Sequence, residues 1–169
     1  PPDGRRENPT VRFGGSDFDA VASAGEFMRA SENDRWFLYV HLMDVHEYTY
    51  SKETALFGSS HSDVYDNSIR YVNLAFQELI DALVATNQLD RTLIVLTSDH
   101  GEEFMEHGRV DHFLTVYQEI LHVPLIFRGQ GVPAGLRIDA PVSVIDIVPT
   151  VLTMAGLAVP EELDGLSLL

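Results

Sequence analysis

Apolar residues along the chain fall into short β-favouring runs and one long helical stripe. The runs at 35–42 (RWFLYVHL) and 92–97 (TLIVLT) are bounded by polar residues, which is typical of strands buried in a sheet. Between them, residues 64–87 carry apolar side chains at every third or fourth position, at Ile69, Val72, Phe76, Leu79, Ile80 and Leu83. This spacing predicts a long helix that lies with one face on a sheet.

The same pattern predicts the remaining elements. They are a helix over 18–30 capped by Asp17, a short helical or irregular segment over 114–121, a strand over 122–127, a short strand over 141–145, and a helix from Asp146 through Ala155. The order strand, long helix, strand is that of a βαβ unit, whose two strands run parallel. We therefore expect an α/β fold with a parallel sheet.

Length and composition fit one globular domain. The chain has 169 residues, 45% of which are hydrophobic, and this length and composition suffice for a sizeable core. Its mean hydropathy of −0.01 is typical of a globular chain. Residues 1–16 are rich in proline, glycine and charge, and we expect a loop or a frayed terminus there. No apolar run approaches the roughly 18 residues that a membrane-spanning helix needs, so we expect no membrane segment in this chain.

The formal net charge of −15, with Lys52 as the only lysine, argues against two classes of partner. Nucleic acids and anionic membrane surfaces are bound through basic patches, so neither is expected to bind this chain. An anionic substrate would need a metal ion or nearby arginine and histidine side chains to offset the repulsion. The sequence has no cysteine, which excludes disulfides and a cysteine nucleophile within this chain and gives no information about the compartment.

Polar residues that suit a metal site follow the run at 92–97. Asp99 and His100 come directly after this predicted strand, and ligands of α/β proteins gather beyond the carboxyl ends of strands. A carboxylate oxygen beside an imidazole nitrogen suits a divalent ion such as Mn²⁺, Zn²⁺ or Fe²⁺ better than an ion that prefers oxygen alone. In the simpler alternative, Asp99 caps a helix that starts at Gly101 and His100 is exposed.

Two further histidines are candidates for contact with a substrate. His46 lies in the polar loop that follows the run at 35–42, and His112 lies downstream of the candidate metal ligands. A histidine in such a loop is ordinarily just exposed, and this alternative stays open for both.

The acidic neighbours of these candidates are expected to have supporting roles. Asp44 lies two residues before His46 and is expected to orient its ring; the alternative is that it serves as a second metal ligand. Glu102 and Glu103 would lie in the first turn of a helix, where negative charge is favoured. His107 is expected in a turn or behind the residues that contact a ligand.

Several segments of the chain form an ordered series of motifs. They are Asp44-Val45-His46 after the run at 35–42, Asp99-His100-Gly101-Glu102, Glu106-His107-Gly108, Asp111-His112, residues 117–127 (YQEILHVPLIF), residues 146–150 (DIVPT) and residues 163–169 (LDGLSLL). In order and spacing they resemble the sulfatase branch of the alkaline-phosphatase superfamily, with Val45 where that family usually has proline. The resemblance covers nearly all of residues 17–169 and implies a three-layer α/β/α sandwich with a mostly parallel or mixed sheet.

The resemblance implies hydrolysis of sulfate esters at a metal-held nucleophile. In the family this nucleophile is a formylglycine made from Cys or Ser, or a plain Ser or Thr in the phosphate- and phosphonate-cleaving relatives. It lies in an N-terminal Cys/Ser-x-Pro-x-Arg motif, and this sequence contains neither that motif nor the family's Asp-Asp pair. Residues 17–169 are therefore expected to be the C-terminal portion of a sulfatase-like domain, inactive without the missing N-terminal portion of the same protein.

The resemblance also implies roles for four residues. Asp99 and His100 match metal ligands; many sulfatases carry Asn in place of His100 and bind Ca²⁺, whereas histidine favours Mn²⁺ or Zn²⁺. His46 matches a histidine that contacts the substrate and can protonate the leaving oxygen. His112 matches a Lys or His near that oxygen, where positive charge offsets the charge that develops on it.

The expected substrates are small-molecule or glycan esters of sulfate or phosphate. Phosphodiester or phosphonate ester hydrolysis and phosphoglycerol transfer are the near alternatives, because sulfuryl and phosphoryl groups share tetrahedral geometry. An alternative from another class is a catalytically silent binding or assembly module. Family habit alone suggests an extracytoplasmic location.

Overall fold

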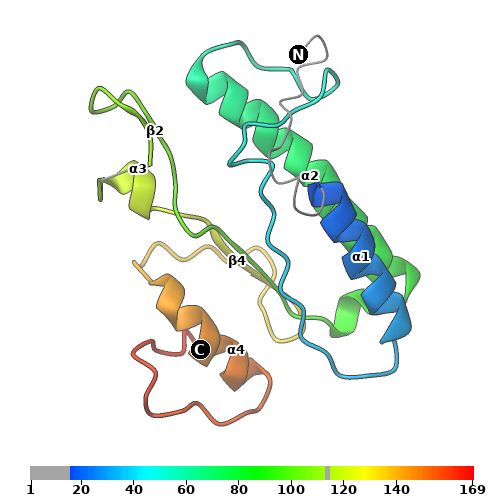
Figure 1. Cartoon of the computed structure of the whole chain (residues 1–169). Helices are drawn as coiled ribbons and strands as arrows, with labels where there is room; N and C mark the ends of the chain where they lie inside the picture. The colour runs from blue at the N-terminus through cyan, green and yellow to red at the C-terminus, as the bar shows by residue number, and fades with distance from the viewer. Residues whose placement is uncertain (1–15, 113–114) are drawn as a thin grey trace. The chain divides into compact units, whose positions relative to one another are not determined.

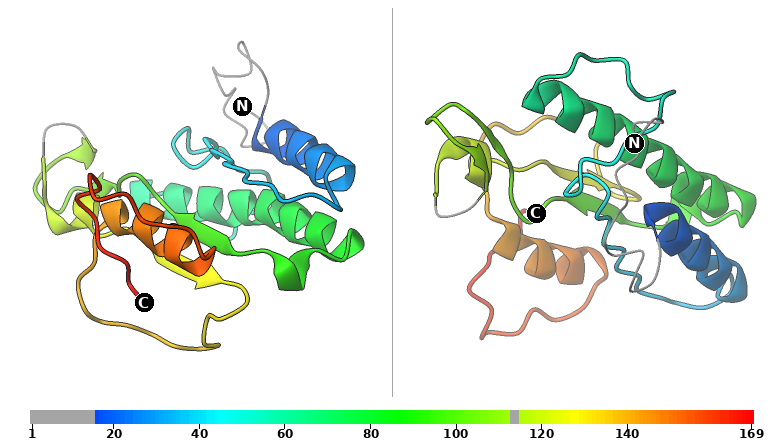
Figure 2. Two further views of the ribbon diagram at one scale, coloured as in Figure 1. Left: turned by 90° about the horizontal axis from the view of Figure 1, so that it is seen from below. Right: turned by 45° about the horizontal axis from the view of Figure 1, so that its top comes forward.

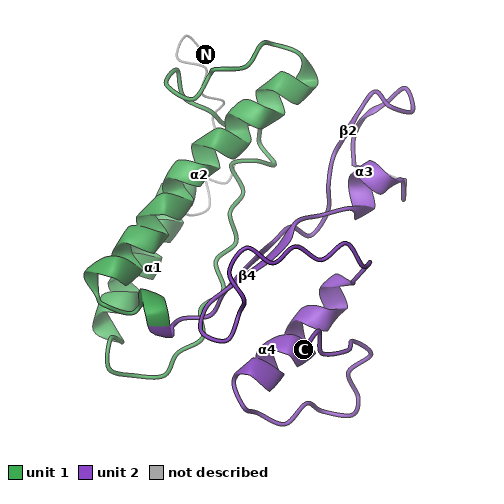
Figure 3. Cartoon of the chain, turned by 180° about the vertical axis from the view of Figure 1, so that it is seen from behind, with its two compact units in different colours: residues 1–90 green, residues 91–169 purple. Residues whose placement is uncertain are grey.

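A computed structural model describes residues 16–112 and 115–169. The chain divides into two compact units, unit 1 (residues 1–90) and unit 2 (residues 91–169), which Figure 3 shows in two colours. Each unit has its own secondary structure and its own set of buried side chains. The expected loop or frayed terminus over residues 1–16 lies almost wholly outside the described residues.

Unit 1 is built on two helices, α1 (Asp17–Ala30) and α2 (His61–Ala85), which pack side by side (Figure 1). Burial of a Val, Leu or Met side chain stabilises a fold by about 1.5–3 kcal/mol. The helices bury six apolar side chains, those of Val21, Ala24, Met28, Tyr71, Ala75 and Leu83. The two predicted helices of this unit are confirmed, with α2 beginning three residues earlier than expected.

Both helices begin at a capping box. At the start of α2, the backbone N–H and hydroxyl of Ser60 donate to Asp63 Oδ2 at 2.9 and 2.6 Å, and Asp63 N donates to Ser60 Oγ at 3.2 Å. Ser16 N donates in the same way to Asp19 Oδ2 at 2.8 Å. These serine hydrogen bonds lower the pKa of both carboxyl groups. The cap of α1 is thus Ser16, one residue before the Asp17 expected from the sequence.

Residues 35–42, predicted as a strand, are extended but pair with no strand in the described part of the chain. Their side chains alternate: Trp36 Nε1 donates to Gln88 Oε1 at 2.9 Å, whereas Phe37 and Tyr39 are 81% and 74% exposed. A strand needs a neighbour for its backbone N–H and C=O groups, and the described elements of unit 1 are helices. The prediction is therefore wrong for pairing, although the alternation expected of a strand is present.

Unit 2 contains two short antiparallel ladders. In the first, Thr97 is opposite Leu125, and in the second, Phe104 is opposite Val110. The paired strands are β1 (Ile94–Thr97) with β4 (Leu125–Arg128), and β2 (Glu103–Phe104) with β3 (Val110–Asp111).

The strands predicted at 92–97 and 122–127 correspond to β1 and β4. Both ladders among the described residues are antiparallel, so the expected parallel pairs are not found in this part of the chain. The chain returns through α3 (Gln118–Leu121), which lies within the helical or irregular segment predicted at 114–121. Leu114 itself lies outside the described residues.

The last helix, α4 (Ile147–Met154), confirms the helix predicted from Asp146 through Ala155. The short strand predicted at 141–145 is wrong: Ser143 N donates to Asp146 Oδ2 at 2.9 Å, and this local bond starts a 3₁₀ turn, η3 (Val144–Asp146), that leads into the helix. The C-terminal segment runs back along α4, as the left view of Figure 2 shows, and Leu166 N donates to Asp146 Oδ1 at 2.8 Å.

Charged side chains interrupt the longest helix of the structure. That helix is α2, with 25 residues, and its charged members include Asp63, Asp66, Arg70, Glu78 and Asp81. Within the described residues, no helix has both the length and the apolar character required to cross a bilayer.

Candidate active site

The residues after β1 form a tight bend that presents Asp99 and His100. Ser98 Oγ donates to the carbonyl oxygen of His100 at 2.6 Å, and His100 N donates to Asp99 Oδ1 at 3.1 Å. The side chain of Asp99 is 72% exposed and that of His100 is 33% exposed. A bend held by its own polar groups therefore leaves both side chains accessible to a ligand.

Gly101 takes the chain from this bend into a close backbone contact with α3. Gly101 N donates to the carbonyl oxygen of Ile120 at 2.7 Å, and Glu102 N donates to that of Glu119 at 3.0 Å. A Cβ at Gly101 would lie 2.0 Å from the carbonyl oxygen of Glu119, so only glycine fits. The alternative in which Asp99 caps a helix starting at Gly101 is wrong, because the chain here leads into the strand β2.

The ring of His100 is oriented by its own loop. Its Nδ1 lies 2.8 Å from the carbonyl oxygen of Gly101, which can only accept a hydrogen bond, so Nδ1 carries the proton. The other ring nitrogen, Nε2, lies 3.8 Å from Asp99 Oδ1. Two ligands at about 2.1 Å from one metal ion are separated by roughly 3–4 Å. The pair Asp99 and His100 therefore has the donor atoms, spacing and ring orientation that one divalent cation requires.

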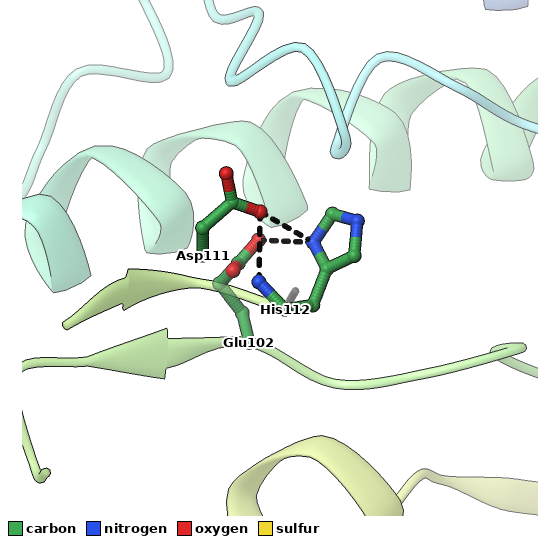
Figure 4. A group of neighbouring side chains, drawn as sticks. All are labelled: Glu102, Asp111 and His112. Carbon is green, nitrogen blue, oxygen red and sulfur yellow. Dashed lines mark hydrogen bonds and ion pairs between the residues drawn. The ribbon is translucent and has the colours of Figure 1, made fainter. Parts of the chain in front are cut away.

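His112 lies against His100. The two imidazole rings stack with their centroids 4.0 Å apart and an interplanar angle of 25°. His112 Nδ1 also lies 3.0 Å from Asp111 Oδ1 and 3.4 Å from Glu102 Oε2. We refer to Glu102, Asp111 and His112 as the Glu102 cluster, whose side chains converge in Figure 4. Three of the four residues singled out in the sequence thus meet at one end of β1.

His46 belongs to unit 1, where it lies in the turn that follows residues 35–42. Its Nδ1 is 3.3 Å from Glu47 Oε1, and its side chain is 44% exposed. The neighbouring Asp44, expected to orient this ring, is buried at 1% exposure and its Oδ2 accepts from Asp17 N at 3.3 Å. The oxygens of Asp17 in turn accept from Met43 N at 2.7 Å and from Asp44 N at 3.0 Å.

These reciprocal bonds fasten the His46 turn to the first residue of α1. Burial raises the pKa of the Asp17 carboxyl, and the nearby charge of Asp44 adds to the effect, whereas the backbone hydrogen bonds oppose it. The carboxyl that the sequence pointed to therefore holds the loop that carries His46, and Glu47 is the acidic group beside its Nδ1.

A second acid–histidine group, the Glu103 cluster of Glu103, His107 and Glu119, lies in the same stretch of unit 2. Glu103 is 1% exposed, and its Oε1 accepts from His107 N at 3.0 Å and from Arg109 N at 3.3 Å. His107 stacks on Tyr117 at 3.6 Å and its Nδ1 lies 2.6 Å from Glu119 Oε1, an ion-pair contact without the angles of a hydrogen bond. His107 is thus in a turn, as expected.

The environment predicted for Glu102 and Glu103 is wrong. Both were expected in the first turn of a helix, but both are buried, and Glu103 begins β2. One signal could have indicated this: Asp111-His112 repeats the acid–histidine order of Asp99-His100, and two histidines that lie together favour carboxylates nearby.

Comparison with known proteins decides the family. The sulfatase family model matches residues 3–157. This chain belongs to the sulfatase family. The resemblance read from the motifs is thereby confirmed.

The curated relatives include arylsulfatase K of Mus musculus, which is 45% identical over 92 residues, and arylsulfatase K of Homo sapiens, which is 44% identical over the same length. Each match covers 54% of this chain and 16% or 17% of the relative. The chain therefore matches less than a fifth of the length of these sulfatases.

Solved structures of the family agree with the fold. The phosphonate monoester hydrolase SpPMH from Silicibacter pomeroyi is 38% identical, with a TM-score of 0.59, and the match covers 63% of this chain and 21% of that protein. Ps i-CgsB is 28% identical with a TM-score of 0.70, over 88% of this chain and 36% of that protein. The 2-O GAG sulfatase BT1596 is 19% identical with a TM-score of 0.69, and the match covers 99% of this chain and 46% of that protein. The chain thus has the α/β fold of sulfatases.

The sulfatase family is metal-dependent, and the donor set of this member can be tested against that property. Asp99 and His100 offer one carboxylate oxygen and one imidazole nitrogen, 3.8 Å apart and on the same bend. Both side chains are reachable from solvent, and the ring is fixed through Nδ1. These residues therefore fit a divalent cation.

Proposed function

We propose that the protein to which this chain belongs hydrolyses sulfate esters, with Asp99 and His100 as two ligands of one divalent cation. The observation that carries this proposal is the 3.8 Å separation of Asp99 Oδ1 and His100 Nε2 in a ring orientation fixed by Gly101. When bound, the cation supplies positive charge that neutralises the ester oxygens and activates a nucleophile. The nucleophile itself comes from a part of the protein outside this chain.

Two histidines serve the ester group in this proposal. His46 donates a hydrogen bond to the sulfuryl group and gives a proton to the leaving oxygen; its turn is held by buried carboxyl groups, and its ring is 44% exposed. His112 lies near the same oxygen and offsets the negative charge that develops there. The stacking of His112 on His100 supports a shared role.

The class of ester is sulfate or a closely related phosphorus ester. The arylsulfatase relatives and the 2-O GAG sulfatase support sulfated small molecules or glycans. SpPMH, a phosphonate monoester hydrolase, supports the alternative of phosphonate or phosphodiester cleavage or phosphoglycerol transfer. His100 in place of asparagine favours Mn²⁺ or Zn²⁺ over Ca²⁺, because imidazole is a softer ligand than an amide oxygen.

In the complete domain, we propose a three-layer α/β/α sandwich with a mostly parallel or mixed sheet. Residues 17–169 form its C-terminal portion. The exposed and alternating side chains of residues 35–42 support their pairing with a strand of the N-terminal portion. An extracytoplasmic location is part of the same proposal by family habit.

The test uses the longer protein that contains this chain, assayed with p-nitrophenyl sulfate and bis-p-nitrophenyl phosphate. Asp99→Ala and His100→Ala should each lower kcat/KM at least about 100-fold, since losing even an outer partner of a metal ligand costs 10–100-fold. The matched control is Asp139→Asn, which removes a carboxylate whose side chain is 91% exposed. Activity that survives Asp99→Ala would contradict the site, and an inactive parent protein would favour a silent binding module.

A further inference from the structure

Glu102 is a buried carboxylate with an unexplained oxygen. Its side chain is 6% exposed, and its Oε1 has no hydrogen-bond partner among the described residues. Leaving a buried charged oxygen without a partner is costly, and native proteins rarely do so unless a water or an ion occupies the place. The carboxylate points into the Glu102 cluster (Figure 4), where its other oxygen, Oε2, lies 3.4 Å from His112 Nδ1.

The donor atoms of this cluster have the spacing of ligands around one ion. His112 Nδ1 lies 3.0 Å from Asp111 Oδ1 and 3.4 Å from Glu102 Oε2, and the three donor atoms all lie within 4.8 Å of one another. Ligands held at about 2.1 Å from a cation are separated by roughly 3 to 4 Å. The side chain of Asp111 is 45% exposed, which leaves a route of entry from solvent.

We propose that Glu102, Asp111 and His112 form a second divalent-cation site, distinct from Asp99 and His100. Two carboxylates and one imidazole are a mixed oxygen and nitrogen set, which suits Mn²⁺ or Zn²⁺ better than Mg²⁺ or Ca²⁺. The site offers two negative charges in a largely enclosed position. It lies entirely within unit 2, on residues between 102 and 112.

A plain ion pair explains less of the structure. One N–H on His112 Nδ1 would have to be shared between Asp111 and Glu102, and Glu102 Oε1 would still lack a partner. Glu103 shows what saturation of a carboxylate by the protein looks like, because its Oε1 accepts two backbone N–H groups. In the same cluster Glu119 Oε1 also lacks a hydrogen bond, but it lies 2.6 Å from His107 Nδ1. The Glu102 cluster has no comparable backbone donors to Glu102 among the described residues.

A cation here would also fix the proton of His112, a consequence that rests on the proposed function. With Nδ1 as a metal ligand, the neutral ring carries its proton on Nε2. That N–H is then a permanent donor for an ester oxygen. The positive charge of the cation also offsets part of the repulsion between an anionic substrate and a chain of net charge −15.

The experiment titrates the 169-residue chain with Mn²⁺ and follows free Mn²⁺ by electron paramagnetic resonance. The background is Asp99→Ala/His100→Ala, so that only the second site remains. We expect one equivalent of bound Mn²⁺, and about tenfold or greater weakening on adding Asp111→Asn or Glu102→Gln. The control is Glu161→Gln, which removes one charge from an exposed position of the same unit and should change nothing.

No bound Mn²⁺ in this background, or equal binding after both Asp111→Asn and Glu102→Gln, would overturn the second site. Asp111→Asn keeps the test valid if the buried Glu102→Gln variant fails to fold. A second readout is the ¹⁵N resonance of His112 Nδ1, which should shift on adding Zn²⁺ and stay unshifted if the cluster is only an ion pair. Because Asp99 and His100 are absent from this background, failure here is separate from failure of the proposed hydrolase.

Discussion

The Glu102 and Glu103 clusters are built from the same residue types a few residues apart, yet they differ in how their carboxylates are satisfied. Glu103 Oε1 accepts two backbone N–H groups and holds the 103–109 loop. Among the described residues, the carboxylate of Glu102 is hydrogen-bonded only to the ring of His112, and its Oε1 has no hydrogen bond. Adjacent residues of an extended chain point to opposite faces, so neighbours in sequence enter different environments. Satisfaction by the backbone marks Glu103 as a structural carboxylate, and its absence at Glu102 makes that carboxylate a candidate ligand.

The largest expected effect is that of Glu103→Ala on stability. The change removes the acceptor of His107 N and Arg109 N and leaves a cavity, so we expect a loss of about 3–5 kcal/mol in the free energy of unfolding. Urea unfolding followed by circular dichroism measures it. In the metal-free protein, Glu102→Gln should change stability by less than about 1 kcal/mol, since it removes a charge that is only partly compensated. Equal losses in the two variants would erase the distinction between the clusters.

The next effect is stabilisation by metal, which should belong to one cluster only. In the Asp99→Ala/His100→Ala background, Mn²⁺ at a hundredfold excess over its dissociation constant should stabilise the fold by about 2.7 kcal/mol. Adding Glu102→Gln should remove most of this gain, whereas adding Glu119→Gln from the Glu103 cluster should leave it unchanged. Thermal unfolding with and without Mn²⁺ gives both values. If the stabilisation by Mn²⁺ depended on Glu119, the ion would bind the Glu103 cluster and the proposed second site would be wrong.

Gly101→Ala tests the backbone contact from which both clusters start. The new Cβ would meet the carbonyl oxygen of Glu119 at 2.0 Å, so α3 must move away and the bonds from Gly101 and Glu102 to its backbone must lengthen. Overpacking of this kind costs about 1–3 kcal/mol. Gly108→Ala is a useful contrast, because nothing lies within 4 Å of the added Cβ and only its φ of +83° opposes the change. A Gly101→Ala variant as stable as the parent would show that α3 is free to shift.

Much of this architecture could be predicted from periodic patterns, and the rest depends on contacts that no pattern encodes. The stripe over 64–87 predicted α2 because a helix repeats every 3.6 residues whatever it packs against. Residues 35–42 have the alternation of a strand, but pairing needs a partner that the described chain does not provide. For the same reason, the parallel strand pairs expected from the sequence are not found among the described residues.

In the candidate site too, some residues could be predicted from the sequence and others could not. Asp99 and His100 could be found because they follow a buried strand directly, a relation that is local in sequence. The position of the Asp111 carboxylate could not be predicted from the sequence. The φ of Asp111 is +104°, outside the strand region, so the alternation of side chains along a strand does not tell which face its carboxylate takes. The burial of Glu102 depends on α3, whose backbone holds Glu102 N from 17 residues away in sequence.

The smallest effect concerns Asp146, a carboxylate satisfied by the backbone but near the surface. Hydrogen bonds from Leu166 N and then Ser143 N lower its pKa below the ordinary value of 3.8. A lowered folded-state pKa contributes stability above pH 3.8, and that contribution is lost as the pH falls through the folded-state value. Asp146→Asn should therefore lower the unfolding midpoint at pH 7 and have less effect near pH 3. Glu161→Gln removes one charge from an exposed position of the same unit and is the matched control. If the Asp146→Asn effect were equal at both pH values, the bonds from Leu166 N and Ser143 N would stabilise the turn without discriminating the charged carboxylate, and satisfaction by the backbone would no longer distinguish Asp146 from an ordinary exposed carboxylate.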